Sequence, residues 1–165
     1  MSENNGVVGE RQLVVFDLNS EAYGVDISAV REIIRMQEIT RVPRAPEFIE
    51  GIINLRGKVI PVGDLRARFS MPGTDRTEEH RIVVVDVEGT DIGMVVDAVK
   101  EVSRIPSNSI EPPSKVITTN DSAYLTGIVK TEEKLIILLD IAKVISDTET
   151  AALKDVQNSP EAVAA

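Results

Sequence analysis

Few residues of this sequence could do catalytic chemistry. Cysteine is absent and His80 is the only histidine, which excludes thiolate nucleophiles, cysteine metal sites and any site built on two histidines. His80 stands in the charged stretch RTEEHR, where we expect a solvated loop residue. GIINLRGK at 51–58 looks like a phosphate-binding loop, but five residues separate its glycines and Val59 stands where Ser or Thr would hold magnesium. The sequence therefore predicts no enzyme: no catalytic residue, no metal site and no cofactor.

The charge balance argues against polyanionic partners. Lys and Arg total 18 against 27 Asp and Glu, a formal net charge of −9, and an acidic surface repels nucleic-acid phosphates and anionic lipids. Three Phe and two Tyr offer little for base stacking. The opening MSENNGVVGE has no apolar core, and no apolar run reaches membrane-spanning length. We expect no nucleic-acid partner and no membrane insertion, and the absence of cysteine fits a reducing cytoplasm.

Short runs rich in β-branched residues predict a mostly β structure, because each is bounded by Gly, Pro, Asn, Asp or charged residues. The runs are LVVFDL, IEGIINL, KVIPV, RIVVVDV, DIGMVVD, YLTGIV and KLIILLD. The helices that the sequence predicts are short. They cover 28–34 behind a Ser cap, 64–69 behind an Asp cap with Arg68 on its outer part, and a segment from Asp140 onward.

An internal repeat organises the chain. A shift of 69 aligns 12–33 with 81–102 without a gap, which places VVFDL on VVVDV and YGVDISAVREI on IGMVVDAVKEV. A shift of 76 then aligns 50–69 with 126–145, and the difference between the shifts predicts a loop near 113–122. Positions shared by both halves should serve the fold, as bulges or close backbone approaches at glycines and as helix caps at aspartates. They include Gly24 and Gly93, Gly51 and Gly127, and Asp64 and Asp140.

Each half supplies five short strands, and such strands hide their edges most economically by closing into a small barrel. The sequence predicts a mainly β fold of two similar five-stranded barrels packed together, with short capping helices and a C-terminal helix. We expect a flexible N-terminus at 1–11, a first barrel at 12–69, a second barrel at 80–145, and a helix end with a flexible tail at 146–165. The groove between the barrels is the expected binding surface.

Positions where the halves differ are better candidates for binding. The turn Asn-Leu-Arg-Gly at 54–57 aligns with Lys-Thr-Glu-Glu at 130–133, so Arg56 stands opposite Glu132. This charge reversal fits either a contact residue or a solvated hairpin arginine. Val30, which aligns with Val99, is either a core residue or a contact.

Five motifs in a fixed order are together highly specific. They are F-x-L-x4-YGVDI-x-x-V-x-EI at 16–33, TR-V-P-x-AP at 40–46, I-x-GIINLRG-x-VIPV-x-DLR at 49–66, GMVVDAV-x-EV at 93–102 and YLTGI at 124–128. With these motifs the chain resembles the CheW family, the coupling proteins of bacterial chemotaxis, over about residues 12–145. The resemblance implies two five-stranded SH3-like barrels and no catalysis. One departure concerns Met36, where several relatives carry a bulky aromatic residue.

The resemblance also implies a function. Such proteins join the tips of methyl-accepting chemoreceptors to the regulatory domain of the histidine kinase CheA, and they support array assembly and kinase control. A protein of this kind is cytoplasmic and is recruited to receptor arrays at the inner face of the cell membrane. The receptor-binding residues that the resemblance implies are Val30, Glu32, Arg56, Gly57 and Val99. The kinase-binding residues are Ile27, Ile39 and Thr40.

Glu32 aligns with Glu101, so we expect part of its role to be structural, through a pairing with Arg56. Other functions stay open at this point. One is a CheW-like adaptor of a non-flagellar pathway that serves pili or a second messenger. More remote are a small-barrel nucleic-acid-binding protein and a small-ligand enzyme.

Overall fold

The computed structural model describes residues 9–43, 45, 48–112, 124–131 and 135–145. The predictions for residues 1–8, for the loop 113–122 and for the tail 146–165 lie outside this part of the chain. The first strand begins at Glu10, so the end of the segment 1–11 that was expected to be flexible belongs to a sheet.

The described chain forms two sheets. Sheet A has the strand order β8-β1-β2-β11-β10-β9 and sheet B the order β3-β6-β7-β5-β4. Sheet A consists of β1 (Glu10–Leu18), β2 (Glu21–Asp26), β8 (Ala98–Pro106), β9 (Ile110–Glu111), β10 (Leu125–Lys130) and β11 (Leu135–Leu139). Sheet B consists of β3 (Val30–Arg35), β4 (Ile49–Leu55), β5 (Lys58–Asp64), β6 (Arg81–Val87) and β7 (Thr90–Val96). The predicted mainly β fold of two similar units is confirmed, with the two-residue β9 as a sixth strand in sheet A.

The strand order obeys the sequence repeat. In the repeat, β1 to β5 correspond in order to β6, β7, β8, β10 and β11. When each strand of sheet B is replaced by its counterpart, the order becomes β8-β1-β2-β11-β10, which is the order of sheet A without β9. The two sheets are therefore equivalent in topology as well as in sequence.

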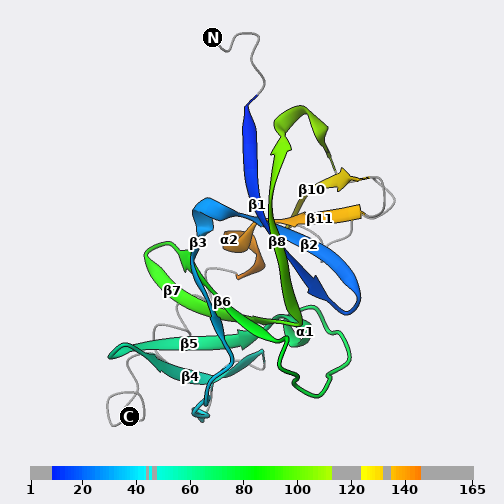
Figure 1. The fold of residues 1–165 in the computed structure, drawn as a ribbon. Coiled ribbons are helices and arrows are strands. Elements are labelled where there is room, and N and C mark those ends of the chain that lie inside the picture. Colours follow the sequence, from blue (N-terminus) through cyan, green and yellow to red (C-terminus); the bar gives the residue numbers. More distant parts are fainter. Residues whose placement is uncertain (1–8, 44, 46–47, 113–123, 132–134, 146–165) are drawn as a thin grey trace.

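Each sheet nevertheless takes strands from both halves of the repeat. In Figure 1, β1, near the N-terminus, lies beside β8, and the two strands pair in antiparallel fashion. All strands of sheet B come from 30–96, whereas sheet A combines 10–26 with 98–139. The boundaries 12–69 and 80–145 follow the repeat and do not separate the two sheets. The chain crosses between the sheets after β2 and after β7, because β3 and β8 each pair with the first strand of the other half.

The helix predicted at 28–34 is wrong. Only a 3-10 turn, η1 (Ile27–Ala29), forms there, and Asp26 rather than Ser28 caps it by accepting the Ser28 N–H at 2.9 Å. From Val30 the chain continues as β3, with alternating burial. Pairing with β6 outweighs the weak local helix signal, since β-branched residues suit a half-buried strand.

Apolar side chains form three main clusters, which explains the runs of consecutive apolar residues. Leu13 and Val15 of β1 pack in a cluster formed by residues of sheet A, and Ile82 and Val84 of β6 pack in a cluster formed mainly by residues of sheet B. The alternate residues of both strands, such as Val14, join a central cluster between the sheets. Because β1 and β6 are buried on both faces, they lack the polar alternation of a half-exposed strand.

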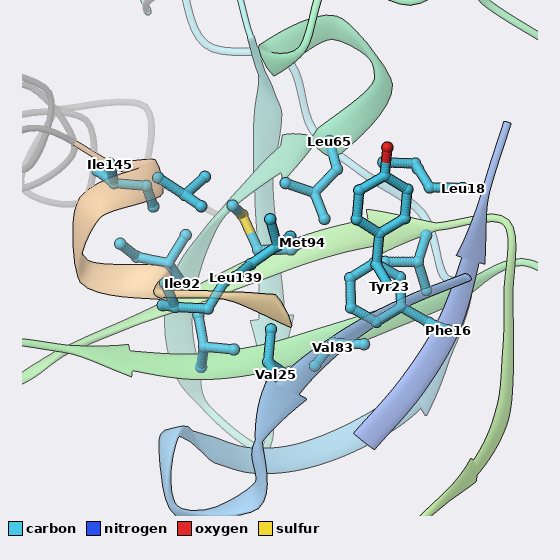
Figure 2. Packing of buried hydrophobic residues seen from close by; sticks show 14 of the residues in the cluster. Phe16, Leu18, Tyr23, Val25, Leu65, Val83, Ile92, Met94, Leu139 and Ile145 are labelled. Atoms are coloured by element: carbon cyan, nitrogen blue, oxygen red, sulfur yellow. The ribbon is translucent and has the colours of Figure 1, made fainter. Parts of the chain in front are cut away.

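The central cluster gathers the aromatic residues of the chain. Phe16, Tyr23 and Phe48 are buried in it, and Phe69 and Tyr124 pack against it. Figure 2 shows Phe16 and Tyr23 lying close together, with Leu65, Val83, Met94 and Leu139 among the surrounding side chains. Ring centroids of successive stacked pairs lie 6.0, 6.2 and 4.9 Å apart from Phe16 to Tyr124. The aromatic side chains therefore pack in the central cluster between the two sheets and not in the separate cluster of either sheet.

Two capping helices confirm the predicted aspartate caps. The carboxylate of Asp64 accepts the Arg66 N–H at 2.9 Å at the start of α1 (Leu65–Arg68). Asp140 accepts the Ala142 N–H at 3.0 Å at the start of α2 (Ile141–Val144). Asp64 and Asp140 occupy equivalent places because each also donates its own N–H to the residue before a strand, at 2.9 and 2.8 Å.

Arg68 was expected on the outer part of its helix, but its side chain makes contacts inside the fold. Its Nε donates to the Val144 carbonyl at 2.8 Å, and its guanidinium carbon lies 5.9 Å from the centre of the Phe48 ring. Arg68 therefore links α1 to α2 and is part of the fold.

The prediction that His80 is a solvated loop residue is also wrong, because its side chain is buried. Its exposed fraction is 4%. Thr77 donates its N–H to His80 Nδ1 at 2.9 Å, and His80 Nε2 lies 3.7 Å from Asp97. A tight turn brings the His80 ring against the backbone of Thr77. The charged residues beside His80 in the sequence therefore give no indication that its side chain is buried.

Candidate protein-binding surface

Arg56 and Gly57 form the turn between β4 and β5. Both have positive φ angles, 52° and 84°, which is the geometry of a two-residue type I′ hairpin. The Gly57 N–H donates to the Asn54 side chain at 2.8 Å. Because Gly is the residue that such a turn favours and Arg is not, the turn geometry explains Gly57 but gives no reason for Arg56.

Arg56 pairs with Glu32 of β3, as expected from the sequence. The Arg56 side chain is 71% exposed, whereas that of Glu32 is 31% exposed. The hydrogen bond and charge of Glu32 raise the pKa of Arg56 above its usual value. Glu32 thus orients a guanidinium that remains open to solvent.

The pair spans the two edges of sheet B. β3 and β4 stand at opposite ends of its strand order, so a contact between them requires the sheet to curl. Thr40 and Ile52 add a backbone bridge, with N–H···O distances of 2.9 and 2.8 Å. Glu32 and Thr40 therefore help to close sheet B into a barrel.

Gly51 shows how closely this closure is packed. A Cβ atom at Gly51 would lie 2.1 Å from the Thr40 carbonyl oxygen, and the register of β4 shifts at this point. Its counterpart Gly127 would place a Cβ 3.1 Å from the carbonyl of Glu111, beside a similar shift. The predicted close approach is confirmed at both glycines.

A row of ion pairs lies beside the turn, across β3, β6, β7 and β5. Arg31 contacts Asp86 at 3.4 Å and Asp91 at 3.1 Å, and Lys58 contacts Asp91 at 2.8 Å. Partial burial opposes ionisation of Asp91, but the hydrogen bond and charge of Lys58, with Arg31, lower its pKa below the usual value. Arg31, Arg56 and Lys58 each form an ion pair with a carboxylate, and the Arg56 side chain is the most exposed of these three.

Val30 and Val99 occupy equivalent places on different sheets. Val30 opens β3 opposite Val85, and Val99 lies on β8 opposite Phe16. Both are half-buried and pack against the central cluster. The question of core or contact is thus answered in part, since each valine contributes to the core and keeps an accessible portion.

The three residues expected to contact a kinase lie in two places. Ile27 is in η1, where the chain crosses between the sheets, and is 36% exposed. Ile39 and Thr40 lie at the closure of sheet B, where Ile39 is half-buried against the apolar interior and Thr40 is exposed. Met36 packs against the same interior.

Three exposed apolar residues were not expected at the surface: Ile33, Val102 and Leu135, the last of which is 55% exposed on β11. Ile33 on β3 is 37% exposed and Val102 on β8 is 51% exposed. They are equivalent positions of the repeat, and β3 and β8 are edge strands. The available signal for Ile33 and Val102 was an apolar residue that follows a glutamate in both halves. Glu132, the counterpart of Arg56, lies outside the described residues.

The described residues contain no cluster of three His, Asp or Glu side chains that could hold a metal. Within the same part of the chain, no helix is long and apolar enough to cross a membrane. The surface around Arg56 instead offers charged, polar and partly exposed apolar groups, which suit contact with another protein.

Comparison with known proteins identifies the family. The model of the CheW-like domain matches residues 12–149. The chain is 35% identical to the chemotaxis protein CheW of Klebsiella aerogenes over 90% of each chain, and 33% identical to that of Bacillus subtilis over 87% of this chain and 90% of the relative.

A solved structure gives the same result. The scaffolding protein TtCheW from Thermoanaerobacter tengcongensis has a TM-score of 0.78 and 45% identity, covering 86% of this chain and 96% of its own. The likeness supports the two SH3-like subdomains expected from the sequence. The chain belongs to the CheW family and is a non-catalytic chemotaxis scaffold protein.

Proposed function

We propose that this protein couples methyl-accepting chemoreceptor tips to the regulatory domain of the histidine kinase CheA, and that it does so in the cytoplasm at receptor arrays. Membership of the family of chemotaxis scaffolds supports this role. The observation that carries the proposal is the exposed Arg56 guanidinium, held by Glu32 on a turn whose geometry does not favour arginine.

Receptor binding is assigned to Val30, Glu32, Arg56, Gly57 and Val99. Kinase binding is assigned to Ile27, Ile39 and Thr40. Arg56 and Gly57 form one turn, and Glu32 and Val30 lie on the neighbouring β3. A partner carboxylate can reach the free part of the Arg56 guanidinium, because an arginine has five N–H donors and Glu32 needs only some of them.

A binding experiment tests this proposal. The purified protein is titrated with a receptor cytoplasmic fragment and, separately, with the CheA regulatory domain, followed by a mixture of all three. We expect binding to each partner and a ternary complex that pellets with receptor-containing membranes. If neither partner binds at micromolar concentration, the coupling role is refuted.

Arg56→Glu supplies the site-specific part of the same experiment. Arg104→Glu is the matched control, because Arg104 is an exposed arginine of β8 in sheet A. Truncating a central interface arginine commonly costs about 2 kcal/mol or more, so we expect Arg56→Glu to weaken receptor binding by at least about tenfold. The control should bind within about twofold of the unmodified protein. Equal losses in both variants would show that the effect comes from overall charge.

A further inference from the structure

The two halves of the repeat cannot form their sheets alone. Here the first half means β1 to β5 and the second half means β6 to β11. Four of the nine strand pairs in the described chain join one half to the other: β1–β8, β2–β11, β3–β6 and β5–β7. Within the first half, only the hairpins β1–β2 and β4–β5 pair, and β3 has no strand partner there. A lone hairpin is marginally stable at best in water, so each half needs a complementary half.

A single exposed segment joins the halves. Residues 70–79 connect α1 to β6, contain no strand, and are exposed from residue 72 onward. Arg76 anchors the segment to Glu50 and to Asp64, the latter at 3.4 Å, and the Pro72 carbonyl accepts from Arg66 at 2.7 Å. Fully extended, ten residues span at most about 36 Å. The segment could therefore reach a half in a neighbouring molecule as well as the half in its own chain.

We propose that two copies of this chain exchange halves, so that the first half of each pairs with the second half of the other in an intertwined dimer. Such a dimer needs no new interface, because every strand pair and all apolar clusters are reproduced with one half from each chain. Only the path of residues 70–79 and the entropy of association distinguish dimer from monomer. A short flexible linker gives an effective concentration in the millimolar range, so exchange becomes favourable at comparable protein concentrations.

An engineered disulfide reports which chain supplies each half. Gln12 of β1 and Arg104 of β8 are register partners from different halves, and both are exposed. Opposite residues of antiparallel strands have Cβ atoms about 4.5–5.5 Å apart, which permits a disulfide after a small adjustment. The chain contains no other cysteine. The variant Gln12→Cys/Arg104→Cys thus closes within one chain in the monomer and between chains in the exchanged dimer.

The variant is unfolded in denaturant and refolded at about 10 μM and at about 1 mM. These protein concentrations lie below and near the effective concentration of the tethered half. Each sample is then oxidised and run on a denaturing gel without reductant. We expect the covalent dimer to rise at least about fivefold at the higher concentration. The control is Lys130→Cys/Leu135→Cys, an exposed register pair within the second half. Its disulfide stays within one chain in both states, so its chains should separate on the gel.

Shortening the connecting segment provides a second measurement. Deleting residues 72–76 from the Gln12→Cys/Arg104→Cys variant leaves five connecting residues, which span at most about 18 Å, and removes the Arg76 contacts. The shorter connection restricts pairing of the halves within one molecule, so the share of covalent dimer at about 10 μM should be higher than in the full-length variant. The proposal is overturned if the full-length variant forms only the bond within one chain at about 1 mM. It is also overturned if the control pair gives as much covalent dimer. If the shortened chain does not fold, the concentration series decides the question.

Discussion

At the scale of single residues, the side chains that help to close sheet B around Arg56 are also those proposed to bind a partner. Glu32 holds Arg56 and thereby joins the edges of sheet B, while the guanidinium stays 71% exposed. Thr40 has the same double position, since its backbone closes the barrel and its side chain is exposed. Substitutions here must therefore be judged by stability and by binding together.

Exchanging the charges of the pair separates these two roles. Arg56→Glu places a carboxylate beside Glu32, so we expect only a small loss of stability at this exposed site. Glu32→Arg/Arg56→Glu restores an opposite-charge pair and should recover most of the loss in thermal denaturation. Receptor binding should remain weak in the double variant, because the charge on the turn is still reversed. Recovery of both properties would mean that the pair acts only on the fold.

Gly51 is the most sterically constrained of the described glycines. Alanine would place its Cβ 2.1 Å from a backbone oxygen, and backbone cannot yield as a side chain does. We expect Gly51→Ala to lower the free energy of unfolding by about 2–4 kcal/mol, in the upper range for single substitutions. Gly73→Ala, where no atom lies within 4 Å, is the control for urea denaturation. Equal midpoints for the two variants would contradict the packing described for the closure of sheet B.

At the scale of elements, an aspartate secures each crossing between the sheets. Asp26, before η1, accepts from Arg11 at 3.2 Å. Asp97, between β7 and β8, binds Arg66 with Nε–Oδ1 and Nη2–Oδ2 distances of 2.9 and 2.7 Å, and it accepts the Asn19 N–H at 2.9 Å. These contacts link segments that neither hairpin formation nor helix capping would bring together.

The Asp97 junction should make folding stability sensitive to acid. Burial opposes ionisation, but the hydrogen bonds from Arg66 and Asn19 and the Arg66 charge lower the pKa of Asp97 below its usual value. A lowered folded-state pKa gives a stabilisation that is present above the unfolded-state value and is lost as the pH falls through the folded-state value. We expect the unfolding free energy to decline below about pH 4, and Asp97→Asn to flatten that decline in urea titrations. An unchanged slope in this variant would place the acid sensitivity elsewhere.

The elements show how far the sequence could predict the structure. Strand-forming runs, the repeat and the caps at Asp64 and Asp140 are local patterns, and they were read correctly. The segment 28–34 was misassigned because its strand character depends on pairing with β6, which is distant in the sequence. Burial of His80 depends on a turn and on Asp97, so nothing in its charged neighbourhood could indicate it.

At the scale of the whole molecule, the repeat predicted two barrels but not how they share strands. Similarity between halves is equally compatible with barrels made from consecutive strands and with barrels that exchange them. The long-range pairings β1–β8 and β3–β6 decide in favour of exchange. The candidate site was partly predictable, since the pairing of Glu32 with Arg56 was expected from the internal repeat, whereas the exposure of Ile33 and Val102 became apparent only once their strands were placed at the edges of the sheets.

We propose that the Arg56 surface transmits receptor control to the kinase. The most direct test measures receptor-dependent CheA autophosphorylation, reconstituted with the unmodified protein, with Arg56→Glu or with Arg104→Glu, after thermal denaturation has shown that all three are folded. We predict that Arg56→Glu reduces receptor-dependent kinase activity at least about tenfold, since a contact worth about 1.4 kcal/mol or more is lost, while Arg104→Glu supports nearly normal activity. A folded Arg56→Glu protein that couples as well as the unmodified protein would refute this role of Arg56.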